Sequence, residues 1–378
     1  MFARFVRSGQ SASVLLLACT MLALGIANSG LAEAYRSMWH LDIAGMSAAH
    51  WVNDGLMAIF FLLIGLELER EIYVGELSAP KNALLPFFAA AGGMAAPAAI
   101  HLMLNAGSPT QAGFGIPMAT DIAFALAALG LLRSRIPPAL KVFVVAFAVI
   151  DDLGAIVLIA TAYSDEIALG YVLGALCIWA VMIAINRFGR VMSLAPYLLG
   201  GIGMWYCFLH AGVHASIAGV LLAFAIPFTA RTPATHSPSH RLEHRLQTPV
   251  NLLILPLFAL ANTAITIDAP LLAGIGEHNG LGIILGLVLG KPLGVVLFSW
   301  IVIRWGLCEL PAGVAWHHMI GAGVLGGIGF TMSIFISNLA FAHQPMLVEA
   351  SKLAVLCASA LSGIAGVAWL LRRKVPAG

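Results

Sequence analysis

Two adjacent aspartates, Asp151 and Asp152, lie in the stretch FAVIDDLGAI (residues 147–156), which is otherwise aliphatic, aromatic or glycine. Asp121 and Lys291 have similarly apolar neighbours. Each such charge at the centre of a membrane helix costs roughly 2.5 to 3.5 kcal/mol. Carboxylates provide the hard oxygen ligands that small cations prefer, and they also bind protons. These four residues therefore predict a site whose charge is exchanged between protons and a cation.

The balance of charge among these residues supports the same interpretation. If all four are ionised, three carboxylates against one ammonium leave two negative charges uncompensated. A proton or a bound cation can supply the missing positive charge, and a site that holds only one of them lets each expel the other. Adjacent side chains point about 100° apart around a helix. Only one of the two aspartates can therefore meet Lys291, and the spacing leaves open which one.

Three other interpretations of these charges are open. A buried Asp–Lys pair can be structural, and lone polar side chains often join helices of a bundle. An intramembrane aspartyl protease would pair Asp121 with Asp151 or Asp152 to activate water, but it has no use for Lys291. A sodium-coupled symporter of organic anions would keep the fold and carry another cargo. The tandem aspartates with a lysine favour proton coupling, so we expect a transporter and not an enzyme.

The composition indicates which elements must position these residues. The chain has 378 residues, is 61% hydrophobic and 10% charged, and has a mean hydropathy of +0.96, which is typical of a polytopic membrane protein. Long uniform apolar windows favour an all-α bundle over a barrel. The net charge of +2 gives no reason to expect nucleic acid as a partner. The twelve candidate spans lie near 12–31, 52–66, 83–104, 113–132, 137–163, 168–185, 192–210, 213–229, 248–268, 281–303, 315–341 and 348–371.

The positions of Lys and Arg predict the orientation. If Arg4 and Arg7 face the cytoplasm, most of the other basic residues fall on the same side, and Arg36 and Lys352 fall at the opposite ends. An even number of spans with both termini in the cytoplasm follows. The first apolar run also resembles a secretory signal, but its removal would leave an odd number of spans. The cysteines and histidines show no metal-ligand spacing, and His214 is interpreted as a packing residue.

Two spans are predicted to be broken. GIPMATDIAF (residues 115–124) has a proline inside a span, and GGIGFTMSIF (residues 326–335) concentrates three glycines. Irregular backbone at membrane depth survives only where protein or a watery cavity satisfies it. If both breaks meet at the midplane, Asp121 can neutralise the positive amino ends of the half-helices and Lys291 the negative carboxyl ends.

Several motifs resemble those of the NhaA-type sodium/proton antiporter family, in the same order from about residue 50 to near the carboxyl terminus. They are VNDGLMAIFFLLIGLELERE (52–71), PMATDIAFAL (117–126), FAVIDDLGAIVLIA (147–160), GVHASIAGV (212–220), RLEHRL (241–246), LILPLFALANT (253–263), GKPLGV (290–295) and GIGFTMSIFI (327–336). The resemblance implies inverted-topology repeats with two broken helices that cross at midplane, an architecture for which NhaA is a known example. One membrane domain is expected, with a transport bundle of about 82–163 and 281–372 and an interface bundle of about 10–81 and 164–268.

The resemblance also implies roles for individual residues. Asp152 carries sodium and protons, Asp151 pairs with Lys291, and Thr120 contributes at the first broken helix beside Asp121. A charged cluster at the cytoplasmic mouth is implied to set the pH response, although helical spacing alone would also pair such charges at a helix end. The residues of this cluster are Glu67, Arg70, Glu71, Glu243 and His244.

The function implied by the resemblance is electrogenic expulsion of Na+ or Li+ from the cytoplasm in exchange for protons. Activity is expected to rise at alkaline pH, because protons compete with sodium for the carboxylates. The implied location is the bacterial cytoplasmic (inner) membrane, and homodimers are expected. No cofactor is expected, and sodium at Asp151 and Asp152 is cargo.

Overall fold

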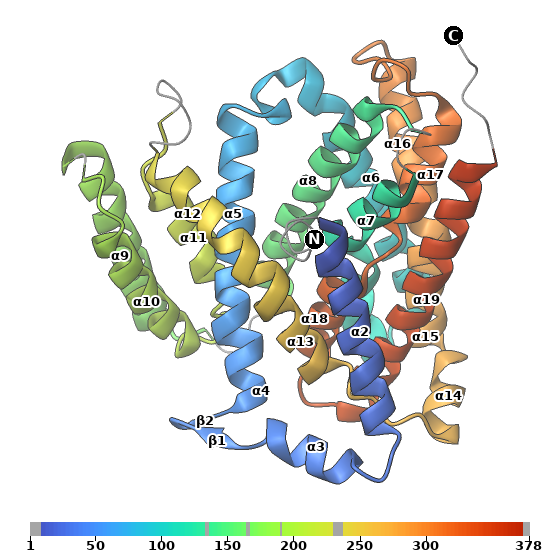
Figure 1. Cartoon of the computed structure of the whole chain (residues 1–378), viewed down its shortest axis with the longest axis horizontal. Coiled ribbons are helices and arrows are strands. Elements are labelled where there is room, and N and C mark those ends of the chain that lie inside the picture. The colour runs from blue at the N-terminus through green and yellow to red at the C-terminus, as the bar shows by residue number, and fades with distance from the viewer. Residues whose placement is uncertain (1–8, 133–135, 164–166, 190, 230–236, 373–378) are drawn as a thin grey trace. The chain divides into compact units, whose positions relative to one another are not determined.

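The computed structural model describes residues 9–132, 136–163, 167–189, 191–229 and 237–372, and this part of the chain is almost entirely helical (Figure 1). The strands in the described residues are β1 (Asp42–Ile43) and β2 (Met46–Ser47), which pair antiparallel with Asp42 opposite Ser47. The predictions that rest on Arg4 and Arg7 lie outside the described residues.

The described helices make the chain a multi-pass membrane protein. Seven are long and apolar enough to span a membrane, or up to nine if each of two bent pairs is one span. The bent pairs are Ser11–Ala27 with Ala32–Trp39, at 119°, and Trp316–Gly326 with Phe330–Ala340, at 45°. The seven long spans are Ala48–Tyr73, Lys81–Asn105, Pro109–Leu132, Pro138–Ala162, Leu169–Gly189, His278–Arg304 and Pro345–Leu371.

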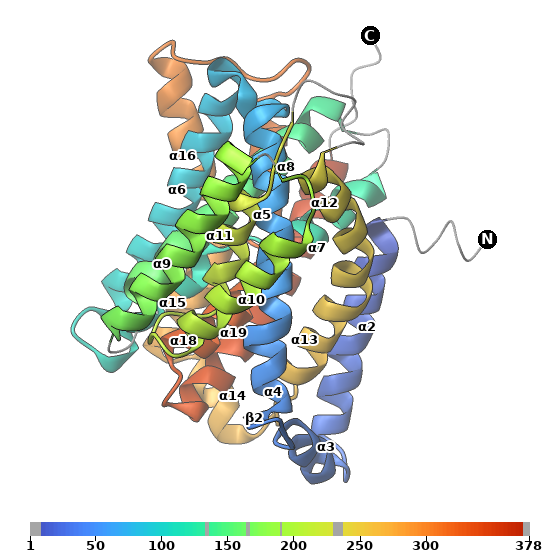
Figure 2. The same cartoon turned by 90° about the vertical axis from the view of Figure 1, so that its left-hand side faces the viewer.

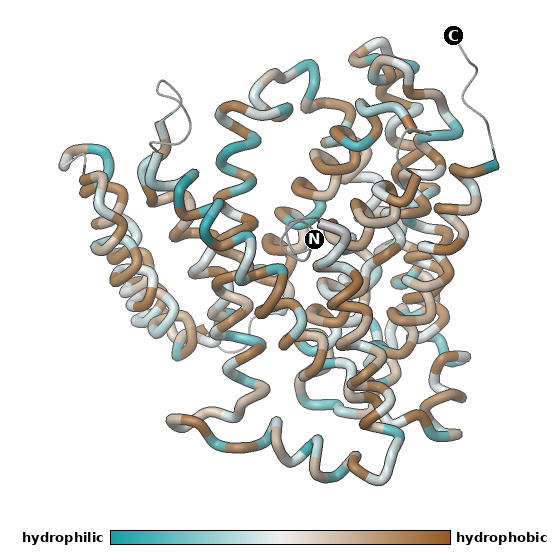
Figure 3. The backbone as a smooth tube through the Cα atoms, in the orientation of Figure 1, coloured by the Kyte–Doolittle hydropathy of each residue, from teal (hydrophilic) through white to brown (hydrophobic). Residues whose placement is uncertain are grey.

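The number twelve stays a prediction. Two predicted windows contain the helices α10 (Ala195–Leu209) and α11 (Ile217–Ala225), which have 15 and 9 residues, and the window 248–268 contains η7 (Val250–Ile254) and α13 (Leu255–Asn262), which continue from the more polar α12 (Pro238–Pro249) without a break. A straight helix needs about 20 residues to cross the hydrocarbon core. The inverted repeats likewise stay a prediction. Figure 3 shows that most helices consist largely of hydrophobic residues, whereas α12 consists mainly of hydrophilic ones.

The chain divides into two compact units. Unit 1 contains Met1–Ala18, Ala79–Ala155 and Ile265–Gly378, and unit 2 contains Cys19–Ser78 and Ile156–Ala264. Helices α2 (Gly9–Ala27) and α8 (Pro138–Ala162) contribute to both. The assignment of a transport role and an interface role to the two predicted bundles stays a prediction.

Unit 1 is built around two helices that approach very closely. A Cβ placed on Gly294 would lie 1.9 Å from the carbonyl oxygen of Gly92, so only glycine allows this approach of α6 and α16. Helix α6 also packs against η3, α15 and η8, and α16 also packs against α17. The elements of unit 1 are α6 (Pro80–Asn105), η3 (Pro109–Met118), α7 (Ile122–Leu132), most of α8, α14 (Ala269–Ile275), α15 (His278–Leu285), η8 (Gly286–Gly290), α16 (Lys291–Arg304), α17 (Trp316–Gly326), α18 (Phe330–Ala340) and α19 (Pro345–Leu371).

Both predicted breaks are present in unit 1. The first follows η3, a 3₁₀ helix that contains Pro117, and leaves residues 119–121 without helical structure before α7 begins. The second lies between α17 and α18, at residues 327–329. Proline removes a backbone donor and glycine weakens a helix, so both sequence signals act as expected.

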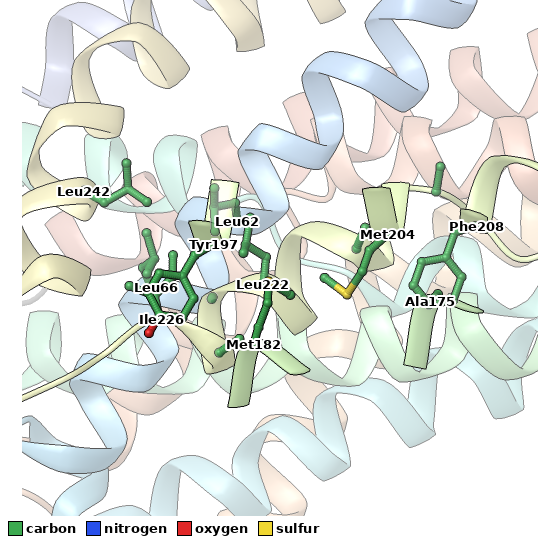
Figure 4. Close-up of a cluster of buried hydrophobic side chains, with 14 of the residues drawn as sticks. Leu62, Leu66, Ala175, Met182, Tyr197, Met204, Phe208, Leu222, Ile226 and Leu242 are labelled. Carbon is green, nitrogen blue, oxygen red and sulfur yellow. The ribbon is translucent and has the colours of Figure 1, made fainter. Parts of the chain in front are cut away.

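Unit 2 has a hydrophobic core contributed by α5, α9, α10, α11 and α12, part of which is drawn in Figure 4. Tyr197, Met204 and Leu66 are fully buried in this core. Helix α11 packs against α5 and α9 (Figure 2). The elements of unit 2 are α3 (Ala32–Trp39), β1, β2, α4 (Ala48–His50), η1 (Trp51–Leu56), α5 (Met57–Tyr73), η2 (Glu76–Ser78), α9 (Leu169–Ala184), η5 (Ile185–Gly189), α10, α11, α12, η7 (Val250–Ile254) and α13.

Candidate ion-binding site

Lys291 and Asp151 form a fully buried ion pair in unit 1. The Nζ atom lies 2.9 Å from Oδ1 and 2.7 Å from Oδ2 of Asp151, and both side chains have an exposed fraction of 0%. The π-helix η8 ends directly before Lys291, and such a turn changes the register of a helix and often marks a functional site. The sequence spacing left open which aspartate pairs with Lys291, and these distances show that it is Asp151.

The ammonium of Lys291 also reaches the first break. Nζ donates a hydrogen bond to the carbonyl oxygen of Met118, the last residue of η3. Carbonyl groups at a helix carboxyl end carry a partial negative charge and have no partner within the helix. Lys291 thus compensates a carboxyl end as well as the carboxylate of Asp151.

Asp121 lies at the amino ends of two half-helices. Its Oδ1 accepts a hydrogen bond from the backbone N–H of Phe124 in the first turn of α7, at 3.1 Å. Its Oδ2 accepts from the backbone N–H of Thr331 at 3.1 Å and from the Thr331 hydroxyl at 2.5 Å, in the first turn of α18. A carboxylate at these positions neutralises the partial positive charge of both amino ends.

Backbone contacts hold the two breaks together. The N–H of Asp121 donates to the carbonyl oxygen of Ile328 at 2.6 Å, and the Thr120 hydroxyl donates to the carbonyl oxygen of Gly326 at 2.8 Å. Thr120 is fully buried and also lies within hydrogen-bonding reach of Asp151. The two interrupted helices therefore meet at Thr120, beside the ion pair.

Asp152 follows Asp151 on α8 and has an exposed fraction of 2%. It lies within electrostatic reach of Lys291, whose Nζ atom is held by Asp151. Because Asp121 is directed to Thr331 and Asp151 to Lys291, these two carboxylates do not share a proton as an aspartyl protease requires. Carboxylate, hydroxyl and carbonyl oxygens gathered in this way suit a small hard cation.

Four of the residues predicted to form the cytoplasmic cluster lie together in unit 2. Arg70 at the end of α5 lies 2.7 Å from Oε1 of Glu71 and 3.0 Å from Oε1 of Glu243 on α12. Glu67, one helical turn before Arg70 and Glu71, lies within electrostatic reach of Arg70 and Glu243. Opposite charges thus join α5 to α12.

His244, the fifth predicted member, is exposed and has no hydrogen bond or ion pair within the described part of the chain. Its neighbour His240 instead places Nδ1 3.3 Å from Oε2 of Glu243. The sequence analysis did not identify His240. Residues three apart lie on the same face of a helix, so its spacing from Glu243 was a signal that could have identified it.

The sequence reading also missed a second group of titratable residues in unit 2. Asp54 in η1 lies between two histidines, with Oδ2 2.7 Å from Nε2 of His50 and Oδ1 3.1 Å from Nε2 of His214. The Nδ1 atom of His214 lies 2.8 Å from the Ser216 hydroxyl. The His50 contact follows an i, i+4 spacing, whereas His214, which the sequence analysis interpreted as a packing residue, is distant in sequence from Asp54, and its contact with that carboxylate had no sequence signal.

Comparison with known proteins gives one family across the chain. The sequence model of the family described as Na+/H+ antiporter 1 matches residues 3–370. A protein of Dechloromonas aromatica (strain RCB) named Na(+)/H(+) antiporter NhaA is 57% identical over 369 residues, which cover 98% of this chain and 95% of that protein. A protein of the same name from Vibrio campbellii is 44% identical over 364 residues, covering 96% and 93%. Another from Helicobacter pylori is 42% identical over 413 residues, covering 97% and 94%.

Proposed function

The chain belongs to the Na+/H+ antiporter 1 family, and from this membership we propose that it exchanges cytoplasmic Na+ or Li+ for protons across a bacterial cytoplasmic membrane. The observation that carries the proposal is the charge balance of the buried site in unit 1. Asp121, Asp151, Asp152 and Lys291 are all buried, so the site contains three carboxyl groups and one amino group. Two positive charges are missing when all four are ionised, and protons or sodium can provide them.

The ion pair makes proton release and cation binding mutually dependent. Both carboxylate oxygens of Asp151 are occupied by the ammonium of Lys291. A cation can bind there only when the ammonium moves away or loses a proton, because two positive charges at one buried carboxylate repel each other. Asp152 is proposed as the main carrier of sodium and protons, and Thr120 as an additional oxygen ligand. No resident cofactor is needed for such an exchange.

Alternating access and electrogenic exchange complete the proposed cycle. Protons bind the carboxylates from the outside, and a cytoplasmic cation displaces them after the site has changed sides. With more than one proton per sodium ion, each cycle moves net charge, so an inside-negative membrane potential drives sodium out. The proposal assigns the protein a role in sodium and pH homeostasis, with activation at alkaline pH and the cluster of Glu67, Arg70, Glu71 and Glu243 as its regulator.

Transport in proteoliposomes tests this function. Vesicles with a preset pH gradient receive Na+, Li+ or K+ between about pH 6 and about pH 9, and a pH-sensitive dye reports proton movement. We expect Na+ or Li+ to dissipate the gradient with the wild type and not with Asp152→Asn. Asp268→Asn is the matched control, because Asp268 lies at the exposed amino end of α14. Full sodium-dependent exchange by Asp152→Asn would contradict the assignment of Asp152 as the main carrier of sodium and protons.

Topology and assembly are proposed on the same basis. We propose that both termini are cytoplasmic, because in this orientation most of the basic residues of the sequence fall on the cytoplasmic side. A homodimer is proposed from the family resemblance, with a contact near the β1–β2 hairpin. Accessibility of single cysteines to impermeant reagents tests the topology, and cross-linking in the membrane tests the dimer. We propose transport as the only activity, with no enzymatic reaction.

A further inference from the structure

A cavity of about 580 Å³ in unit 2 has no role in the exchange cycle. It is formed by the last turn of α5, the end of α9 with η5, and the chain at and after the end of α11. Two of the long membrane spans end here, at Tyr73 and Gly189. The cavity therefore lies at the ends of spans, where lipid headgroups meet water.

The walls of the cavity are largely apolar and aromatic. Tyr73 and Phe228 stack with ring centroids 5.2 Å apart and an interplanar angle of 17°. Phe224, Ile183 and Ile226 add apolar surface. Aromatic side chains favour the headgroup level of a membrane because they are amphipathic. A cavity of this size and lining suits an amphiphile with a compact headgroup.

Two opposite charges also line the cavity. Glu69 has an exposed fraction of 4%, and its Oε2 accepts a hydrogen bond from the Ser239 hydroxyl at 2.6 Å. Within the described residues Oε1 of Glu69 has no hydrogen bond, and Arg187 has neither an ion pair nor a hydrogen bond. The second carboxylate oxygen of Glu69 and the guanidinium of Arg187, both without a protein partner among the described residues, thus share one cavity. A ligand that carries both an ammonium and an anion can satisfy both.

We propose that this cavity binds the headgroup of a phospholipid with a primary ammonium, of the phosphatidylethanolamine class. The phosphate accepts two hydrogen bonds from the guanidinium of Arg187, a geometry that arginine forms readily. The ammonium donates to Oε1 of Glu69. The acyl chains follow the apolar side chains exposed beside the cavity on α9 and η5, such as Val181 and Phe188, which are 58% and 85% exposed. The zwitterion, and not the phosphate alone, determines the selectivity.

Native mass spectrometry of the purified full-length protein tests the proposal. The protein is mixed with equal amounts of phosphatidylethanolamine, phosphatidylcholine and phosphatidylglycerol that have identical acyl chains, and the retained lipids are counted. We expect phosphatidylethanolamine to be retained preferentially, since the quaternary ammonium of phosphatidylcholine cannot donate a hydrogen bond and phosphatidylglycerol has no ammonium. Equal retention of the three lipids, or preference for phosphatidylglycerol, would overturn the proposal.

Two substitutions separate the contributions of the charges. Glu69→Gln keeps an acceptor for Ser239 and should reduce the preference for phosphatidylethanolamine over phosphatidylglycerol about tenfold, the effect of one charge-assisted hydrogen bond. Arg187→Gln should reduce retention of all three lipids. Glu309→Gln and Arg245→Gln alter exposed charges outside the cavity and should change neither value. An unchanged preference in Glu69→Gln, or an unchanged total retention in Arg187→Gln, rejects the site.

A soluble ligand and the transport function are distinguished in the same experiment. Free phosphoethanolamine carries the same two charges without acyl chains, and we expect it not to displace the lipid at equal concentration. Displacement would assign the cavity to a soluble zwitterion and overturn the lipid proposal. Asp152→Asn should retain lipid like the wild type, because the proposed lipid site does not depend on ion exchange.

Discussion

Lys291 holds both carboxylate oxygens of Asp151, at 2.9 and 2.7 Å, and neither side chain is exposed. Breaking such a pair leaves one buried charge without compensation, which costs more than the pair itself contributes. Substitution of Lys291 or Asp151 alone therefore has two effects at once, the loss of a group of the cation/proton site and the loss of stability. Stability and exchange activity have to be measured separately.

Lys291→Ala should lower the free energy of unfolding by about 3 to 5 kcal/mol, because the carboxylate of Asp151 remains buried and unpaired. The double variant Asp151→Asn/Lys291→Gln removes both charges and keeps hydrogen-bonding groups, so it should recover most of this loss. Thermal unfolding in detergent measures both. If the double variant is no more stable than Lys291→Ala, the pair does not behave as a buried ion pair.

Thr331→Val should lower the free energy of unfolding by about 1.5 to 3 kcal/mol, because it removes the hydroxyl donor to the buried carboxylate of Asp121. Thr331→Ser keeps the hydroxyl and serves as the control. Thermal unfolding of the two variants is compared directly. Equal stability of both variants would show that the hydrogen bond from the Thr331 hydroxyl to Asp121 contributes nothing to the junction of α7 and α18.

Asp121→Asn should weaken sodium-dependent proton movement even where the protein folds. The substitution removes a charge that lies at the amino ends of α7 and α18, so these ends retain partial positive charge that repels a cation nearby. The apparent KM for Na+ in proteoliposomes should increase, with Asp268→Asn as control. A folded Asp121→Asn variant with unchanged KM contradicts the proposed compensation.

The apparent KM for Na+ should fall as the cytoplasmic pH rises. Sodium and protons compete for the same carboxylates, so below the pKa of the site each proton that must leave makes the KM about tenfold higher per pH unit of acidification. Above that pKa the KM should become constant. Initial exchange rates at several sodium concentrations and pH values give the curve. A KM that is independent of pH would contradict competition.

Glu243→Gln should lower the free energy of unfolding by about 1 to 3 kcal/mol and alter the pH profile of exchange, because Glu243 joins Arg70 to His240. His244→Gln on the same helix should stay within about 0.5 kcal/mol of the wild type and keep the profile, since its side chain is exposed. Thermal unfolding and exchange between about pH 6 and about pH 9 compare the two. Equal behaviour would remove Glu243 from the regulatory cluster.

The sequence predicted those features that depend on local composition. Apolar windows indicated membrane helices, and Pro117 and the glycines of residues 326–329 indicated both breaks, because these residues disturb a helix wherever they occur. Helix lengths were less predictable, since an apolar window also fits a short or bent helix such as α11.

The sequence predicted which residues form the candidate site, but it did not predict which of them are in contact. Burial and charge drew attention to Asp151, Asp152 and Lys291, but the pairing depends on how α8 and α16 are rotated in the folded protein. The contact of His214 with Asp54 joins residues 160 positions apart, for which one sequence has no signal. Such contacts follow from tertiary packing alone.

The glycine contact between α6 and α16 restricts which parts of unit 1 can move. At Gly92 and Gly294 backbone lies against backbone, so no side chain is available to change rotamer and let one helix slide along the other. Lys291, one turn before Gly294, therefore travels with α6. A change in the distance between Lys291 and Asp151 therefore comes from the Lys291 side chain itself or from a movement of α8 relative to the pair of α6 and α16, and not from sliding of α16 along α6.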